Sequence, residues 1–368
     1  MKIAYLSTFY PFRGGIAQFN ASLFRELEKS EEIKAYTFTT QYPNLLFPGS
    51  TQFVQNDDNA DKIDAKRILN TINPFSWLLT GNSIADYAPD MLITKFWMPF
   101  FAPSLGTVYK LFKKNHTKRV AILDNVIPHE KRLGDIQLIR YFLGNCDNFI
   151  VMSDTVKYDL LKLKPDANYI QLPHPLYDNF GNKIDKKEAR SKLGIEQSKK
   201  ILLFFGFIRK YKGLDNLIEA LNYLEDDYEL MICGEVYGSF DEYSDLINQN
   251  HLNGRVHLFN QYIADNQVSD YFCAADLCVL PYKSATQSGI VGISYYFDLP
   301  VLATNTGSLR EMIEPFGAGI MIDKSEPMLI AEGIKRYFGS DTNHIKENIK
   351  SYKNVASWKN FAEQIKNF

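Results

Sequence analysis

A basic loop separates a strand-like run from a helical pattern in the second half of the chain. The run FFGFIRKYKGL crosses Gly206, presents Arg209 and Lys212, and reaches Gly213 before the helix begins. Cations placed ahead of a helix N-terminus, with glycines that let the backbone approach closely, suit a diphosphate group. Solvated loop charges are the alternative for any such run, and its place directly after a strand favours the ligand site.

A second turn, SATQSG at residues 284–289, carries no basic side chain and lies between a strand and an apolar helix. At the start of such a helix the amides of Gly289, Ile290 and Val291 lack intrahelical acceptors and can bind phosphate oxygens. The alternative is that Thr286 or Ser288 only caps a core helix. Capping and anion binding are compatible, so we expect this turn to hold the other side of the diphosphate.

Three further loops follow predicted strands. Gly14 and Gly15 lie between the first strand and the first helix, where an α/β sheet offers backbone amides to ligands, although a lone glycine pair is a weak signal. The run LDNVIPHEK brings Asp124 and His129 after another strand, where either could bind sugar hydroxyls or assist a hydroxyl nucleophile. A structural role is equally open for His129. Glu235 ends a later strand and is either a base or ribose contact or merely solvated.

Composition and missing motifs exclude several classes of function. No G-x-G-x-x-G or P-loop pattern occurs, which disfavours a nicotinamide or flavin dinucleotide. The six histidines show no HxxxH pair and there is no Asp-x-Asp triplet, so no metal is expected. A net charge of -2 provides no overall field for nucleic acid. The four cysteines form no CxxC pair and indicate small buried residues in a reducing compartment.

The elements that position these loops alternate between strands and helices. Strand-like runs extend from KIAYLST to NFIVMS in the first half and from KKILLFFGFI to PVLATN in the second. Such alternation predicts parallel sheets covered by helices on both faces. Because 368 residues exceed one ordinary core, we expect two domains. The predicted fold is α/β, with two Rossmann-like doubly wound domains facing across a cleft and ligand loops at the carboxyl ends of their strands.

The predicted boundaries follow from composition. The stretch 173–200 is rich in turn formers and charge, which is typical of a linker. We therefore predict a first domain at 1–178 and a second at 179–344. Residues 345–368 form an amphipathic pattern that is expected to pack back on the first domain as a helix.

Contact with a membrane is one reading of an aromatic segment in the first half. FWMPFFAPSLGTVYKLFKKNH combines aromatic residues with Lys113 and Lys114, which suits an anionic interface or a lipid-linked substrate. A buried core segment is the favoured alternative. No stretch has the length of a bilayer span, and the N-terminus does not resemble a secretory signal. We expect a cytoplasmic protein, with association at the inner face of the membrane left open.

The motifs together resemble a known family over nearly the whole length. The matching points are the Gly14–Gly15 loop, GFIRKYKGLDNLIEAL, the strand-end CGE, the stretch from NQYIADNQVSDYF through SATQSG to PVLATNTGSLREMI, and Ser357–Trp358. In these the chain resembles the family-4 retaining glycosyltransferases of GT-B architecture. IPHEKR, LPHPLYDNFG and YKSATQSG are similar to signatures of a bacterial subgroup.

The resemblance implies that the second domain binds a nucleotide-diphosphate sugar, UDP and GDP not being distinguished, and that no metal or other cofactor is needed. Arg209 and Lys212 would neutralise the diphosphate leaving group, because its departure requires positive potential at the developing phosphate charge. The residues expected to contact the donor are Gly206, Glu235, Tyr262, Gln287, Ser288, Gly289, Ile290 and Val291.

The same resemblance implies that the first domain binds a glycan or lipid-linked acceptor, at Gly15, Asp124 and His129. The sugar would be transferred with retention of anomeric configuration, in the synthesis of a cell-surface polysaccharide. One departure concerns the donor site. The family's pair of glutamates falls on Thr286 and Ile293, and an isoleucine cannot hydrogen-bond ribose hydroxyls. The family's arginine after the strand glycine is Phe207 here, and we expect Gln287, Ser288 and Glu235 to take over part of this work.

Two alternative functions stay open. The missing glutamates suggest a non-catalytic partner subunit that binds nucleotide, which donor turnover by the pure chain would exclude. A sugar-nucleotide epimerase or a phosphorylase of the same two-domain plan is the other alternative. Such an epimerase needs several acid–base carboxylates and histidines in its cleft, and this chain offers few.

Overall fold

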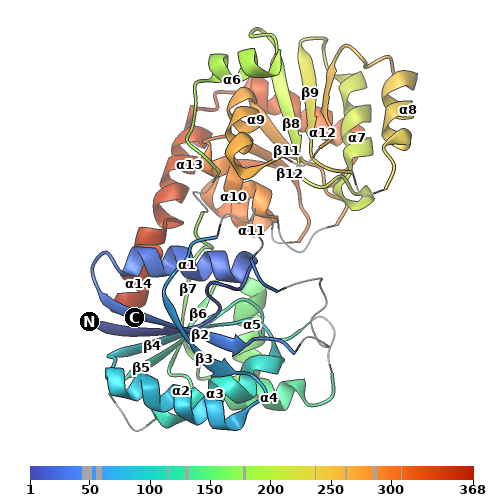
Figure 1. The fold of residues 1–368 in the computed structure, drawn as a ribbon. Helices are drawn as coiled ribbons and strands as arrows, with labels where there is room; N and C mark the ends of the chain where they lie inside the picture. Colours follow the sequence, from blue (N-terminus) through green and yellow to red (C-terminus); the bar gives the residue numbers. More distant parts are fainter. Residues whose placement is uncertain are drawn as a thin grey trace. The chain divides into compact units, whose positions relative to one another are not determined.

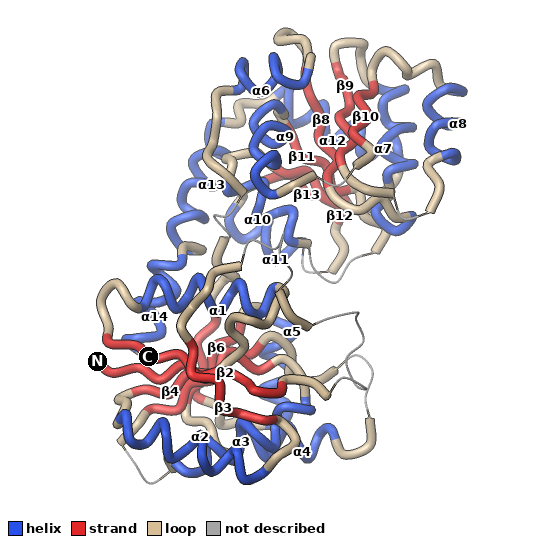
Figure 2. The backbone as a smooth tube through the Cα atoms, viewed as in Figure 1, coloured by secondary structure: helices blue, strands red, loops and turns tan. Residues whose placement is uncertain are grey.

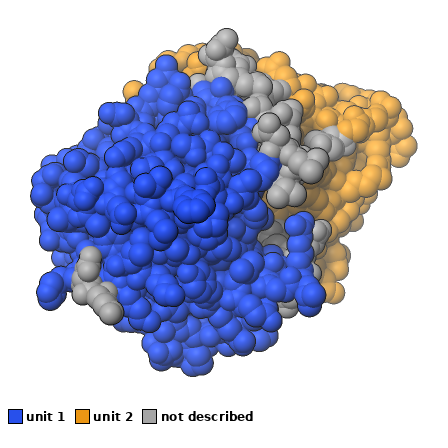
Figure 3. Space-filling model, turned by 60° about the horizontal axis from the view of Figure 1, so that its bottom comes forward, with its two compact units in different colours: residues 1–174, 358–368 blue, residues 175–357 orange. Residues whose placement is uncertain are grey.

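The chain forms two compact units, each built around one parallel sheet, in the computed structural model (Figures 1 and 2). The structure describes residues 1–43, 52–54, 60–113, 116–128, 132–176, 180–236, 238–261, 263–284, 288–307 and 309–368. Unit 1 comprises Met1–His174 with Trp358–Phe368, and unit 2 comprises Pro175–Ser357. Figure 3 colours the two units separately.

Unit 1 contains a seven-stranded sheet in the order β3-β2-β1-β4-β5-β6-β7, with every pair parallel. Its strands are β1 (Lys2–Leu6), β2 (Glu32–Thr40), β3 (Ala65–Asn70), β4 (Met91–Phe96), β5 (Lys118–Leu123), β6 (Asn148–Val151) and β7 (Asn168–Gln171). Its helices are α1 (Gly15–Leu27), α2 (Pro74–Tyr87), α3 (Ala102–Leu111), α4 (Asp135–Leu143), α5 (Asp154–Leu163) and α14 (Trp358–Asn367). Helices α2, α3 and α4 pack side by side on one face, and α1 packs with α14 on the other (Figure 1).

Unit 2 contains a six-stranded parallel sheet in the order β10-β9-β8-β11-β12-β13. Its strands are β8 (Lys200–Phe205), β9 (Tyr228–Cys233), β10 (Val256–Phe259), β11 (Leu277–Leu280), β12 (Val301–Thr304) and β13 (Gly319–Ile322). Its helices are α6 (Lys186–Leu193), α7 (Leu214–Ala220), α8 (Asp241–Gln249), α9 (Val268–Ala274), α10 (Gly289–Tyr296), α11 (Leu309–Ile313), α12 (Pro327–Gly339) and α13 (Asn343–Val355). The predicted fold class of two Rossmann-like α/β domains is confirmed.

Central strands are buried on both faces, as a parallel sheet with helices on both sides requires. Every residue of β4 and of β9 is buried, and each unit has its own hydrophobic cluster. In both sheets the strand order reverses at one point, between β1 and β4 in unit 1 and between β8 and β11 in unit 2. Loops at the carboxyl ends of the strands beside such a reversal are the usual ligand sites of doubly wound sheets.

The unit boundaries differ from those predicted at 178 and 344, because the final helical pattern is two helices rather than one. Helix α13 packs in the core of unit 2 through Ile349 and Tyr352, next to α10. Only α14 belongs to unit 1, where Trp358 and Phe361 pack edge-on against Phe19 of α1. The chain therefore passes between the units after residue 174 and again after residue 357.

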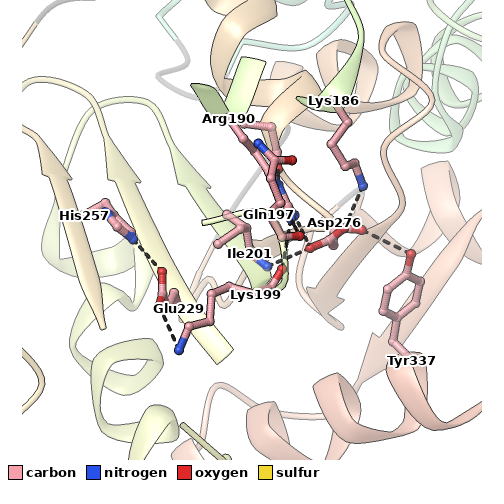
Figure 4. A network of polar contacts seen from close by, with 10 residues as sticks. Lys186, Arg190, Gln197, Lys199, Ile201, Glu229, His257, Asp276 and Tyr337 are labelled. Carbon is pink, nitrogen blue, oxygen red and sulfur yellow. Dashed lines mark hydrogen bonds and ion pairs between the residues drawn. The ribbon is translucent and has the colours of Figure 1, made fainter. Parts of the chain in front are cut away.

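A polar network joins the amino ends of the strands of unit 2 (Figure 4). The carboxylate of Asp276 accepts hydrogen bonds from the amide of Ile201 at 2.7 Å and from the buried Arg190 at 2.7 Å. On the neighbouring strands, Glu229 lies 2.7 Å from His257. These partners tie α6 to the starts of β8 and β11, at the end of the sheet opposite to the ligand loops.

The aromatic segment that follows β4 lies mostly inside unit 1. Phe96, Phe101, Tyr109 and Phe112 are all buried, which confirms the core reading of this segment. Lys113 is exposed, and Lys114 lies outside the described residues. None of the helices in the described ranges is both long enough and apolar enough to cross a bilayer. The four cysteines are free and buried, as predicted.

Candidate active-site loops

The loop after β8 surrounds a buried lysine. Gly206 follows the strand with φ 99°, and a Cβ atom there would lie 3.1 Å from Lys212 Nζ. A glycine therefore serves both the backbone angle and the space that the ammonium group occupies. The Lys212 residue is only 8% exposed, so its charge lies at the carboxyl end of β8 rather than in bulk solvent.

The same loop packs directly on the loop after β11. Gly213 has φ 70°, and a Cβ atom there would come within 2.0 Å of the Pro281 carbonyl oxygen. The amide of Lys283 donates to the carbonyl of Tyr211 at 2.7 Å. The two loops that flank the reversal of strand order in unit 2 are thus fixed against each other.

Lys212 carries a charge that this loop does not neutralise. Burial, together with the neighbouring positive charge of Arg209, lowers the pKa of Lys212 from 10.5 to about 8. Across the described parts of the chain, no carboxylate or hydrogen-bond acceptor contacts Lys212 Nζ, and the nearest recorded aromatic ring, that of Tyr282, is centred 5.7 Å away. Arg209 itself is exposed. An anionic ligand would supply the missing counter-charge.

Helix α10 begins beside this lysine. The side chain of Ile290 would lie 3.6 Å from a Cβ at Gly206, so the first turn of α10 and Lys212 approach the same glycine. Ser288 is the N-cap; its hydroxyl accepts from the Ile290 amide at 3.4 Å and lies 3.3 Å from the hydroxyl of Tyr282. Gly289 is exposed, with open space around its Cα. The capping role is therefore present, and the remaining first-turn amides have no intrahelical acceptor.

Glu235 lies at the carboxyl end of β9, next to the loop after β8. Its carbonyl accepts from the amide of Ile208 at 2.9 Å, while its side chain is exposed. Phe207 is 47% exposed in the same loop. Ile293 packs against the core of unit 2, which suits its side chain and leaves no polar group at that position. Four of the predicted residues, His129, Tyr262, Thr286 and Gln287, lie outside the described residues.

In unit 1 the start of α1 is open. Gly14 precedes the helix and Gly15 begins it, without a side-chain cap. A Cβ atom at either position would meet nothing within 4 Å, so the first amides of this helix are accessible to a ligand. His174, by contrast, packs its ring against that of Phe19, with the ring centroids 5.2 Å apart.

Asp124 follows β5 and forms an ion pair that the sequence did not reveal. Its Oδ1 lies 2.5 Å from Lys95 Nζ, and the exposures of the two side chains are 20% and 1%. Lys95 is the only charged residue of β4, in the run MLITKF, near the carboxyl end of the strand. A lone lysine in a buried strand is the signal that could have identified it, because such a charge requires a partner.

The structure therefore gathers Gly206, Arg209 and Lys212 of the loop after β8 with the first turn of α10 in unit 2, and Glu235 lies on the adjoining loop. In unit 1, Asp124 and the start of α1 lie at the same end of their sheet. Among the described residues, no cluster of histidine, cysteine, aspartate and glutamate has the geometry of a metal site. The arrangement in unit 2 can bind an anion through one buried cation and helix amides.

Comparison with known proteins points to one family. Residues 185–355 match the family model described as glycosyl transferases group 1. The putative teichuronic acid biosynthesis glycosyltransferase TuaC of Bacillus subtilis is 25% identical over 259 residues, which cover 68% of this chain and 62% of TuaC. The chain thus spans about three-fifths of the length of that relative.

Solved structures share the fold of the whole chain. A glycosyltransferase from Rickettsia africae matches with a TM-score of 0.71 at 17% identity, over 99% of this chain and 97% of that one. HepE of Anabaena, solved in complex with UDP, matches with a TM-score of 0.67 at 14% identity, over 100% and 99%. At this level of identity the likeness concerns the fold.

Proposed function

We propose that this protein is a retaining glycosyltransferase, because residues 185–355 match the family model described as glycosyl transferases group 1. It transfers a sugar from a nucleotide-diphosphate sugar to a glycan or lipid-linked acceptor, without a metal or other cofactor. The observation that carries the proposal is Lys212, a buried cation without a counter-charge in the described structure, placed beside the first turn of α10. The likeness of the fold to HepE, solved with UDP, supports a nucleotide donor.

The donor diphosphate binds between the loop after β8 and the start of α10. Lys212 and Arg209 neutralise the phosphate oxygens, and the amides of Gly289 to Val291 add hydrogen bonds. As the bond to the sugar breaks, negative charge grows on the leaving diphosphate. A cation already held in a partly desolvated site stabilises that charge without reorganisation, which lowers the barrier.

The ribose and the donor sugar are held by groups other than the family's glutamate pair. The apolar Ile293 offers nothing to a hydroxyl, whereas the exposed carboxylate of Glu235 lies on the adjoining loop. We assign the ribose contact to Glu235, together with Ser288 and Gln287 from the turn before α10.

The acceptor binds on unit 1. The open start of α1 at Gly15 and the carboxylate of Asp124 lie at the carboxyl ends of the strands. We assign His129, which is outside the described residues, to the same acceptor site. A carboxylate can accept a hydrogen bond from the attacking hydroxyl and orient it. The name of the relative TuaC supports an acceptor in polysaccharide biosynthesis.

Thermal unfolding with a panel of UDP, GDP and their sugars tests the donor site. A ligand that binds only the folded state raises the melting temperature, and we expect one nucleoside diphosphate to do so in the wild-type chain. Lys212→Ala is expected to abolish this shift and sugar transfer together. Lys210→Ala is the matched control, because Lys210 lies in the same loop but is exposed and paired with Glu242 at 3.0 Å. Equal shifts in the wild type and Lys212→Ala would contradict the proposal.

A non-catalytic nucleotide-binding subunit is the second candidate, and Ile293 is the observation that favours it. Such a protein would show the same thermal shift but no turnover. Transfer from a nucleotide sugar by the purified chain excludes this candidate, and a shift without hydrolysis or transfer under any acceptor condition would favour it.

A further inference from the structure

Lys95 is a buried charge that the proposed chemistry of the donor site does not use. It is the penultimate residue of β4, and its side chain is 1% exposed. Its ammonium lies 3.3 Å from the ring centre of Phe19 on α1 and 2.5 Å from Asp124 Oδ1 after β5. No other acceptor contacts Lys95 Nζ within the described residues. One carboxylate and one aromatic face thus form its whole recorded polar environment.

A purely structural role explains this lysine poorly. Burying an ammonium group is costly even when it is paired, and a methionine of similar length would fill the same apolar space. The pKa of Lys95 is lowered by burial, while Asp124 opposes this shift. Burial of the Lys95 charge therefore costs stability, which indicates that the charge acts on its partner Asp124.

The partner is placed to use that charge. The backbone of Asp124 continues the β4–β5 pairing, with its amide donating to the carbonyl of Phe96 at 2.9 Å. One carboxylate oxygen contacts Lys95, whereas the side chain as a whole is 20% exposed. No hydrogen bond to the second oxygen, Oδ2, is recorded in the described structure. The pair thus presents a fixed carboxylate at the end of the sheet where ligands bind.

We propose that Lys95 is a positioning residue that holds Asp124 in one orientation, so that Asp124 Oδ2 accepts the hydrogen bond of the acceptor hydroxyl. The inference rests on the proposed glycosyltransferase function and adds a residue to its acceptor site. Lys95 touches neither substrate. It acts through Asp124 alone, whereas donor binding depends on unit 2.

Tyr5 on β1 is a second titratable group near Asp124 among the described residues. Burial raises the pKa of Tyr5, so this hydroxyl stays neutral through the working range and bonds to Asn20 at 2.6 Å. The recorded contact of α1 with the pair is the uncharged ring of Phe19.

The test compares Lys95→Met with Arg119→Met. Arg119 is a second buried cation of the same sheet, paired with Asp147 at the opposite, amino end of β5. We expect Lys95→Met to raise the KM for the acceptor about tenfold or more, because the carboxylate loses its orientation. Binding of UDP and hydrolysis of the donor by water are expected to stay unchanged. Arg119→Met should lower stability without a change in the KM for the acceptor.

The double variant Lys95→Met/Asp124→Asn separates the positioning role from general damage. If Lys95 acts only through the carboxylate, adding Lys95→Met to Asp124→Asn should not raise the acceptor KM beyond that of Asp124→Asn alone. Independent, multiplying effects would overturn the inference, as would an unchanged acceptor KM in Lys95→Met.

A measurement without turnover checks the charge state itself. In ¹⁵N-lysine-labelled protein, the Lys95 ammonium is expected as a slowly exchanging signal at neutral pH, lost in Lys95→Met. A neutral amine at pH 7 would overturn the inference and leave the proposed function standing. Absence of sugar transfer by the wild-type chain would instead overturn both.

Discussion

At the scale of single residues, the ionisation of Lys212 couples ligand binding to pH. Its pKa of about 8 means that the free protein loses this positive charge as the pH rises through 8. A diphosphate binds the protonated form, so its affinity should fall above pH 8, by at most about tenfold per pH unit. Titration calorimetry with UDP between pH 7 and 9.5 measures this slope.

Lys212→Arg is the control for this pH dependence, because arginine stays charged over the whole range. We expect weaker binding in the variant, since the buried site fits a lysine, but no fall above pH 8. The same slope in Lys212→Arg would show that another group is titrating.

The Lys95–Asp124 pair predicts an asymmetry in stability. Asp124→Asn leaves a cation that is 1% exposed without its counter-ion, whereas Lys95→Met leaves a carboxylate that water can still reach. Removing one partner of a buried pair costs about 3 to 5 kcal/mol, and we expect Asp124→Asn to approach this cost and Lys95→Met to stay below it. Urea unfolding of both variants measures the order, and a larger loss in Lys95→Met would contradict this account.

Residue types and spacing alone led to part of the candidate site. Gly206, Arg209, Lys212 and Ser288 could be singled out because each lies at a strand end or a helix start that is visible in the sequence. Lys95 could not be matched to Asp124 in the same way. The two residues become partners only because β4 and β5 are neighbours in the sheet, and sheet order is a property of the fold.

At the scale of elements, three of the four strands at the sheet edges were not predicted from the sequence, whereas the fourth, β10, was. The unpredicted strands are β3, β7 and β13, and each lies at the edge of its sheet. Only one residue in β3 and one in β13 are buried, and none in β7. An edge strand has a neighbouring strand on one side only, and its sequence shows a weak apolar pattern. The central strands, by contrast, are continuous apolar runs in the sequence.

The turn after β8 makes a prediction at this scale. Gly206→Ala introduces a Cβ atom at φ 99° and 3.1 Å from Lys212 Nζ, so it both strains the turn and displaces the ammonium. We expect a loss of about 1 to 3 kcal/mol in stability together with a marked loss of UDP affinity.

Gly254→Ala is the matched control for this change, because Gly254 is exposed and a Cβ atom there meets nothing within 4 Å. Its stability and its affinity for UDP should both stay near the wild-type values. If Gly206→Ala bound UDP as tightly as Gly254→Ala does, the loop after β8 would not form the phosphate site.

At the scale of the whole molecule, the two sheets follow one plan but their chain segments are interleaved. The repeated strand-and-helix pattern was enough to predict two doubly wound domains. The position at which the chain returns to unit 1 could not be predicted. Helices α13 and α14 form one amphipathic pattern in the sequence and differ only in the hydrophobic core that each joins.

Removal of residues 358–368 tests this division. Without α14, Phe19 loses the rings of Trp358 and Phe361, and we expect unit 1 to unfold at a lower temperature. Unit 2 keeps its own core, so the truncated chain should retain UDP binding with the same dependence on Lys212. Loss of UDP binding on truncation would show that UDP binding by unit 2 depends on α14.

The central claim is that the buried cation after β8 and the bare amides of α10 hold one diphosphate. A crystal structure of the complex with UDP tests it most directly. We predict phosphate oxygens within about 3 Å of Lys212 Nζ and of the amides of Gly289 to Val291. A diphosphate bound away from both groups would contradict the account.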